Sequence, residues 1–178
     1  MAKIVSDLSN TSAGASLPKN VYIMEIIKCD DVISKEKEEN GRKVGGGNPM
    51  FVFTYKVTND PNNAQYEGRQ VGFHNVVYGG VNERGEPNNI GRVLDQIIAT
   101  KIPWDHTESN CGSVDITASP VRDMKRNAYF CPECSNQIKA IAYDPDHFLH
   151  KMVKVDVGVR KQQGSDKEFN DVKAVLPL

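Results

Sequence analysis

Apolar and polar residues alternate along most of this chain, and an alternation with period two predicts extended strands. In residues 20–34 apolar side chains occupy both faces, which is typical of a largely buried strand. The clearest alternation lies in residues 49–60, and the flanking glycines of the next segment indicate bends or bulges. Five segments show the strand pattern: residues 20–34, 49–60, 68–80, 151–159 and 169–178. The last two segments predict a hairpin that turns at Gly164-Ser165.

The period changes once, in residues 88–102. Apolar residues recur there at the i, i+3, i+4, i+7 and i+8 positions, beginning at Ile90, so the segment predicts an amphipathic helix of about three to four turns. Asn88 or Asn89 is the expected N-cap, and Pro103 is expected to end the helix.

The order of these elements predicts a mostly β fold, a five-stranded OB-fold barrel with one helix after the third strand. Residues 1–18 are rich in Ser, Ala, Asn and Thr and are expected to form a flexible arm. Residues 19–178 then form a single OB-fold domain, in which residues 35–48 are a flexible connector with three successive glycines. Residues 105–150 interrupt the pattern before the final hairpin, and we call them the insert.

Composition limits the class of protein and the cellular compartment that we expect. The chain has 178 residues, of which 39% are hydrophobic, and no apolar run approaches the roughly 20 residues of a membrane helix. Its first residues lack the apolar core of a secretion signal, so a cytoplasmic location without membrane association is expected. Four cysteines in a reducing compartment indicate thiols or metal ligands rather than disulfides. The net charge of −1 excludes a strongly basic DNA-wrapping protein but allows a local basic groove.

The insert carries a candidate zinc site. Cys131-x2-Cys134 can bind one ion from a single tight turn, and His147-x2-His150 would complete four ligands. A second completion stays open, in which His106 and Cys111 form the other half, as in a zinc ribbon. No H-x-E or H-E-x-x-H pattern is present, so we expect a structural Zn²⁺ that holds the polar insert. The alternative is a pair of reduced structural thiols.

Aromatic and basic residues suggest contact with single-stranded nucleic acid, because bases stack on aromatic rings while Lys and Arg contact phosphates. The aromatic candidates are Phe51, Phe53, Tyr55 and Phe73. The basic candidates are Lys56, Arg69, Arg122, Lys125 and Arg126. An alternating Phe/Phe/Tyr face also fits the core of a barrel, and the sequence does not decide which face points outward.

Four blocks, about 120 residues in all, resemble small phage-encoded single-stranded DNA-binding proteins of OB-fold type. They read LPKNVYIMEIIKCDDV, then FVFTYKVTND with YEGRQVGFHNVV, then NNIGRVLDQIIAT, and finally FLHKMVKVDVGVRKQQGSDKEFNDVKAVLP. The resemblance implies binding of single-stranded DNA during phage DNA replication or recombination. The Cys/His insert is not a general feature of that group. Many of its members also end in an acidic tail that recruits replication proteins, whereas this sequence ends in AVLPL.

These observations predict a protein that is not an enzyme and that binds single-stranded DNA with little sequence preference, with other replication or recombination proteins as further partners. The alternative is a zinc-ribbon module for protein interaction, acting as a replication or transcription accessory. A metal-dependent nuclease is disfavoured because no cluster of carboxylates accompanies the candidate ligands.

Overall fold

The computed structural model describes residues 16–178 except residues 45 and 83, so most of the expected N-terminal arm lies outside the described residues. The strands are β1 Asn20–Ile33, β2 Lys37–Glu39, β3 Arg42–Val44, β4 Pro49–Val57, β5 Gln70–Val77, β6 Trp104–His106, β7 Val121–Asp123, β8 Ala128–Phe130, β9 Ile141–Tyr143, β10 Met152–Lys161 and β11 Glu168–Leu176. The helices are α1 Gly91–Thr100 and the 3₁₀ turns η1 Ala64–Tyr66 and η2 Pro145–Phe148.

The five long strands form one antiparallel sheet in the order β11-β10-β1-β4-β5. All five were predicted from the alternation of apolar residues. In the described residues no strand ladder joins β5 to β11, so the sheet is open between these two edges. The closed five-stranded barrel expected from the sequence is therefore not confirmed, whereas the mostly β fold with one α-helix is.

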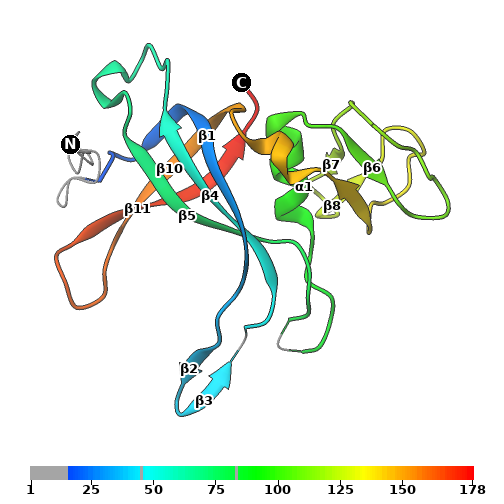
Figure 1. Ribbon diagram of the computed structural model, residues 1–178, viewed down its shortest axis with the longest axis horizontal. Coiled ribbons are helices and arrows are strands. Elements are labelled where there is room, and N and C mark those ends of the chain that lie inside the picture. Colours follow the sequence, from blue (N-terminus) through cyan, green and yellow to red (C-terminus); the bar gives the residue numbers. More distant parts are fainter. Residues whose placement is uncertain (1–15, 45, 83) are drawn as a thin grey trace, which may run out of the picture.

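One face of the sheet forms the core, because alternate side chains on a strand point to the same side. Phe53, Tyr55 and Val57 on β4 are fully buried, and Phe51 is 4% exposed. Helix α1 lies between the sheet and the insert (Figure 1) and buries Val93, Leu94 and Ile97. The 3₁₀ turn η2 also covers this face, because its Phe148 makes edge contacts with Phe51 and Phe53 of β4. The aromatic residues of β4 are thus surrounded by protein.

The expected connector of residues 35–48 contains a short hairpin, β2–β3, which projects from the sheet (Figure 1). Asn40 and Gly41 have φ angles of 53° and 74° at its turn. Two consecutive residues with positive φ match the type I′ turn that Asn-Gly favours between strands. The segment predicted as a flexible connector therefore contains a short hairpin at residues 37–44, which its charged and glycine-rich composition did not indicate.

The insert consists of two small antiparallel pairs, β6–β9 and β7–β8. Trp104 is 1% exposed, and its indole Nε1–H donates to the Ala118 carbonyl at 3.0 Å. Ile116 and Ile138 are also buried, and all three belong to the same cluster as the core of the sheet. Ile116 also forms an isolated β-bridge with Trp104.

The end of the predicted arm is fixed to the sheet. Leu17 is buried, and its backbone N–H donates to the Asn170 side chain at 2.7 Å. The Asn170 amide in turn donates to the Leu17 carbonyl at 2.8 Å. Leu17, which the sequence analysis assigns to the arm, is therefore held against the sheet.

Candidate functional site

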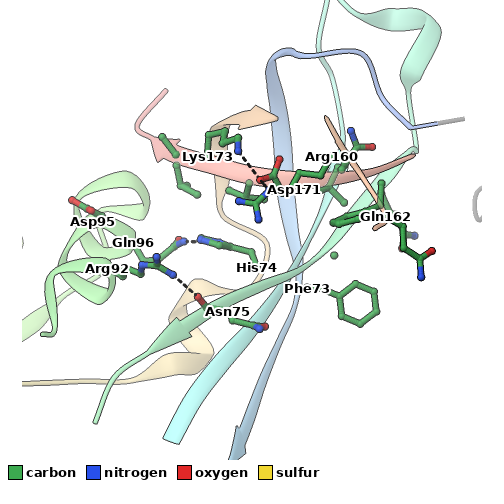
Figure 2. Close-up of a pocket in the computed structure, with 18 residues that line it drawn as sticks. Phe73, His74, Asn75, Arg92, Asp95, Gln96, Arg160, Gln162, Asp171 and Lys173 are labelled. Atoms are coloured by element: carbon green, nitrogen blue, oxygen red, sulfur yellow. Dashed lines mark hydrogen bonds and ion pairs between the residues drawn. The ribbon is translucent and has the colours of Figure 1, made fainter. Parts of the chain in front are cut away.

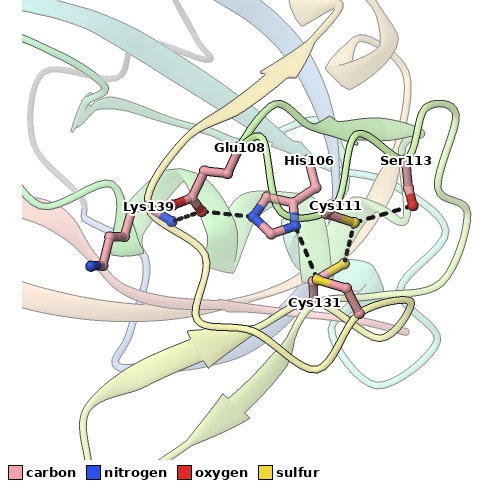
Figure 3. Close-up of polar contacts among 7 residues, drawn as sticks. His106, Glu108, Cys111, Ser113, Cys131 and Lys139 are labelled. Atoms are coloured by element: carbon pink, nitrogen blue, oxygen red, sulfur yellow. Dashed lines mark hydrogen bonds and ion pairs between the residues drawn. The ribbon is translucent and has the colours of Figure 1, made fainter.

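Four side chains of the insert converge on one point, and Figure 3 shows the contacts around it. His106, Cys111, Cys131 and Cys134 each offer one ligand atom, and these four atoms lie within 4.8 Å of one another. His106 is fully buried, and Cys131 is 1% exposed. Among the described residues this is the one cluster of His, Cys or acidic side chains that is close enough to hold a metal ion.

Two distances between these atoms are close to those of a tetrahedral metal site. Bond lengths of about 2.3 Å to sulfur and about 2.0–2.1 Å to nitrogen place two sulfurs about 3.8 Å apart, and a sulfur and a nitrogen about 3.6 Å apart. In the structure the Sγ atoms of Cys111 and Cys131 lie 3.9 Å apart, and Cys134 Sγ lies 3.5 Å from His106 Nδ1. The cluster is therefore compatible with a structural zinc site with one His and three Cys ligands.

A short turn after β6 brings the first two ligands together. His106 is the last residue of β6, and the chain then folds back so that the backbone N–H of Cys111 donates to the Glu108 carbonyl at 3.0 Å. Gly112 also donates to this carbonyl and has a φ of 64°, in the left-handed region that favours glycine. The turn explains why four residues can separate two ligands of one ion.

A second turn supplies the other two ligands. Cys131 follows directly on β8, and Ser135 N–H donates to the Cys131 carbonyl at 2.9 Å. Ser135 has a φ of 62°, so the chain reverses immediately after Cys134. The spacing of two residues therefore points both thiols toward His106.

The outer shell of the cluster orients the histidine. His106 Nε2 lies 2.7 Å from the Glu108 carboxylate, which also accepts a hydrogen bond from the Lys139 backbone N–H at 2.9 Å. A carboxylate on one ring nitrogen fixes the tautomer that leaves the other nitrogen free to bind metal. Hydrogen bonding to His106 lowers the pKa of Glu108, so this carboxylate is charged at neutral pH.

The thiols differ in acidity. Ser113 Oγ lies 3.1 Å from Cys111 Sγ, and hydrogen bonds with Ser113, Cys134 and His106 together lower the pKa of Cys111 to about 6. Burial raises the pKa of Cys131, because the charged thiolate is poorly solvated there. Metal ligation requires the thiolate form, so Cys111 is ready to bind at neutral pH, while Cys131 would release a proton on binding.

The structure places the predicted histidine ligands elsewhere. His150 Nδ1 lies 2.7 Å from the Glu25 carboxylate on β1, and His147 is half exposed beside Asp144. Instead, the second completion considered from the sequence, His106 with Cys111, joins Cys131 and Cys134. All four positions are filled by protein atoms, which is typical of a structural site, because a catalytic zinc keeps one position open.

A groove lies at the open side of the sheet, between β5 and β11, and we call it the seam groove (Figure 2). Its volume is about 940 Å³, and α1 contributes to its wall. Its charged side chains are Arg92, Asp95, Arg160, Asp171 and Lys173, and its aromatic side chains are Phe73, His74 and Phe169. This mixture of cations and rings is the kind of surface that binds single-stranded nucleic acid.

Phe73 is the most unusual residue of the seam groove. Its side chain is 91% exposed, and its φ is 60°, which is rare for a bulky residue. The pairing of β4 with β5 shifts here, so that Gly72 and Phe73 both lie opposite Thr54 in a bulge. The bulge turns the ring away from the core, whereas an uninterrupted alternation would put it on the same face as Val71.

The other predicted stacking residues are not available. Phe51, Phe53 and Tyr55 are at most 4% exposed, so the alternating face of β4 forms the core and not the binding surface. Lys56 lies 3.8 Å from Glu25, and neither it nor the half-buried Arg69 lines the seam groove.

The three basic candidates of the insert lie on the β7–β8 hairpin. Arg122 is 3.4 Å from the Asp95 carboxylate, and its guanidinium lies over the Tyr129 ring. Arg126 is 3.5 Å from Asp123, and the side chain of Lys125 is exposed. These three cations therefore lie on one hairpin of the insert, whereas the aromatic candidates lie on strands of the large sheet.

A buried polar network supports the floor of the seam groove. The Tyr55 hydroxyl lies 2.7 Å from His74 Nδ1, and the Gln96 amide donates to that hydroxyl at 2.9 Å. Burial, with Arg92 nearby, lowers the pKa of His74 to about 4, so the ring is neutral at pH 7. Gln96 Oε1 is buried without a partner among the described residues.

Sequence reasoning missed several residues of the seam groove. Gln96 carried a usable signal, because it lies between Val93 and Ile97 on the apolar face of the helix. Phe169 and Lys173 both lie on the last predicted strand. Nothing in the sequence shows that this strand, β11, lies next to β5 without pairing with it. Arg92 looked like an ordinary exposed helix residue.

In the described residues no helix has the length and apolar character needed to cross a bilayer. No protein-family model, curated protein or solved structure matches this chain.

Proposed function

We propose that this protein binds single-stranded DNA in the seam groove, with little sequence preference and without catalysis. The observation that carries the proposal is Phe73, an aromatic ring held by a bulge in an unfavourable backbone conformation and left 91% exposed. Backbone strain of this kind persists where a function requires it. A base that stacks on the ring would remove its apolar surface from water.

The order of the strands supports an OB-type sheet. An OB-fold is a partly open five-stranded barrel that binds oligonucleotides on its second and third strands, between the loops after the first and fourth strands. The corresponding elements here are β4 and β5, flanked by the β2–β3 hairpin and the β10–β11 turn. We therefore propose an OB barrel that is open at the seam between β5 and β11.

The charges of the seam groove suit a phosphate backbone. Arg92, Arg160 and Lys173 face two carboxylates, so the groove is positive although the whole chain carries −1. The Asp171 carboxylate accepts a hydrogen bond from Lys173 at 2.7 Å and pairs with Arg160. Binding of phosphates should release counterions, so affinity should fall steeply as salt rises.

We further propose that the metal is a structural Zn²⁺, held by His106, Cys111, Cys131 and Cys134. When bound, it would cross-link the turns after β6 and β8 and hold the insert against α1. We also propose a role in phage-type DNA replication or recombination, which rests on the resemblance of the strand and helix blocks and not on the metal-holding insert.

The test is a titration of fluorescently labelled oligo-dT with the wild-type protein and Phe73→Ala at two salt concentrations. Loss of one stacked base is worth about 1–3 kcal/mol, so the variant should bind about 5- to 150-fold more weakly. Val114→Ala is the control, because Val114 is 70% exposed and does not line the seam groove. Equal affinity of Phe73→Ala and the wild-type protein would contradict this assignment of the site.

A second candidate is a protein-interaction module centred on the metal. Val121 is 55% exposed and Met124 is 73% exposed, so the β7–β8 hairpin presents apolar side chains to solvent. If no oligonucleotide binds even at low salt, this second function is favoured.

A further inference from the structure

A second hollow adjoins the seam groove at α1, and we call it the helix hollow. Its volume is about 370 Å³, and its walls come from the end of β5, the start of α1 and the β7–β8 hairpin. Arg92 and Asp95, three residues apart on α1, line both hollows, so the two adjoin at this face of the helix. Arg122 lines the far side of the helix hollow.

We propose that a DNA strand bound at Phe73 continues past Arg92 through the helix hollow to Arg122, so that the insert lengthens the binding site. This inference rests on the proposed function. It adds a path for the strand and assigns a role in binding to the metal-holding insert.

The two arginines along this path are held weakly. The Arg92 guanidinium donates to the Asn75 carbonyl at 3.4 Å, and Arg122 lies 3.4 Å from the Asp95 carboxylate. Strong charge-assisted bonds are shorter, about 2.7–2.9 Å. Since Arg122 is also 41% exposed, a phosphate in the helix hollow can compete for these guanidinium groups. The walls also carry the amides of Asn88, Asn89 and Asn127, which can bind phosphate or sugar oxygens.

The insert is docked firmly where the path crosses it. The Tyr129 hydroxyl on β8 donates to the Asp95 carboxylate of α1 at 2.6 Å. A Cβ atom on Gly91 would lie 3.2 Å from the Tyr129 ring, so helix and hairpin pack closely at this point. Arg122 pairs with Tyr129 across the hairpin, and the candidate ligand Cys131 follows two residues later. The metal turn is thus directly linked to the strand that positions Arg122.

The experiment measures the affinity of labelled oligo-dT of increasing length, from about 4 to about 20 nucleotides, which covers the site sizes of OB-folds. Arg122→Ala should bind the shortest oligomers as the wild-type protein does and the longest ones several-fold more weakly. For long oligomers the slope of log K against log salt should fall in magnitude by about 0.7, the value for one lost phosphate contact on a single strand. Arg92→Ala should weaken all but the shortest oligomers.

Lys139→Ala is the matched control, because Lys139 is an exposed cation of the same insert that lines neither hollow. Thermal unfolding of each variant shows whether the fold is kept. If Arg122→Ala binds every length as the wild-type protein does, while Phe73→Ala binds weakly, the path is overturned and the proposed function stands. If no oligomer binds to the wild-type protein at low salt, the proposed function itself fails.

Discussion

At the scale of single residues, the network of Tyr55, His74 and Gln96 is the most consequential feature of the sheet. Tyr55 is fully buried, and the partners of its hydroxyl among the described residues are His74 and Gln96. A buried polar group without a partner costs about 1–3 kcal/mol, so each member depends on the others. The network therefore fixes α1 against β4 and β5 beneath the seam groove.

This network predicts a pH dependence of stability. The pKa of His74 is about 4 in the folded protein, against about 6.5 in an unfolded chain. Between these values the unfolded chain binds a proton that the folded protein does not, so the free energy of unfolding falls as pH falls from 6.5 to 4. For this group alone the loss by pH 4.5 should be about 2–3 kcal/mol.

Urea unfolding at several pH values checks this prediction by comparing the wild-type protein with His74→Gln. The difference between the two removes the contributions of the carboxylates and of the metal centre, which both proteins share. His147→Gln is the control, since His147 is half exposed. Parallel curves for the wild-type protein and His74→Gln between pH 6.5 and 4.5 would show that His74 does not titrate as stated.

At the scale of elements, two substitutions in the bulge of β5 should differ in their effect on stability but not in their effect on DNA binding. Phe73 has a φ of 60°, and a residue with a Cβ pays roughly 1–2 kcal/mol for this conformation, whereas glycine does not. Phe73→Gly should therefore be more stable than Phe73→Ala by about 1 kcal/mol, while both variants lose the stacking ring and bind oligo-dT equally weakly. Chemical denaturation and the titration measure the two effects. An alanine variant as stable as the glycine variant would mean that the bulge relaxes when the ring is removed.

The sequence predicted the strands and the helix better than it predicted the β-bulge and the contacts between turns. Alternation located all five long strands, and the 3.6-residue period located α1, because both patterns reflect burial on one face. Uninterrupted alternation would put Phe73 on the face of Val71, but the bulge shifts the phase by one residue, so Val71 and Val76 are both buried while Phe73 is exposed. The Cys131 pair was recognisable from local spacing. The choice of His106 and Cys111 over His147 and His150 depended on how the turn after β6 meets the turn after β8, which spacing does not encode.

At the scale of the whole molecule, the described residues form a large sheet and a smaller insert. Their buried residues form one cluster, and α1 contacts β5, β10 and β11 on one side and β8 on the other. The insert contains four strands of three residues each. Short strand pairs are marginally stable in water unless something else holds them, and metal ligation supplies such a constraint in small domains.

Loss of the metal should therefore unfold the insert and leave the sheet intact. Cys134→Ser should reduce the zinc content measured by elemental analysis, whereas His150→Ala should keep it, because His150 lies against Glu25 and outside the ligand cluster. Amide hydrogen exchange should become fast in β6–β9 and stay slow in β1, β4 and β10. Since Arg122 would lose its position while Phe73 would not, Cys134→Ser should bind short oligo-dT normally and lose the additional affinity for long oligomers. Fast exchange throughout β1 and β4 would contradict this prediction. It would show that the metal stabilises the entire fold through the buried cluster that the sheet and the insert share.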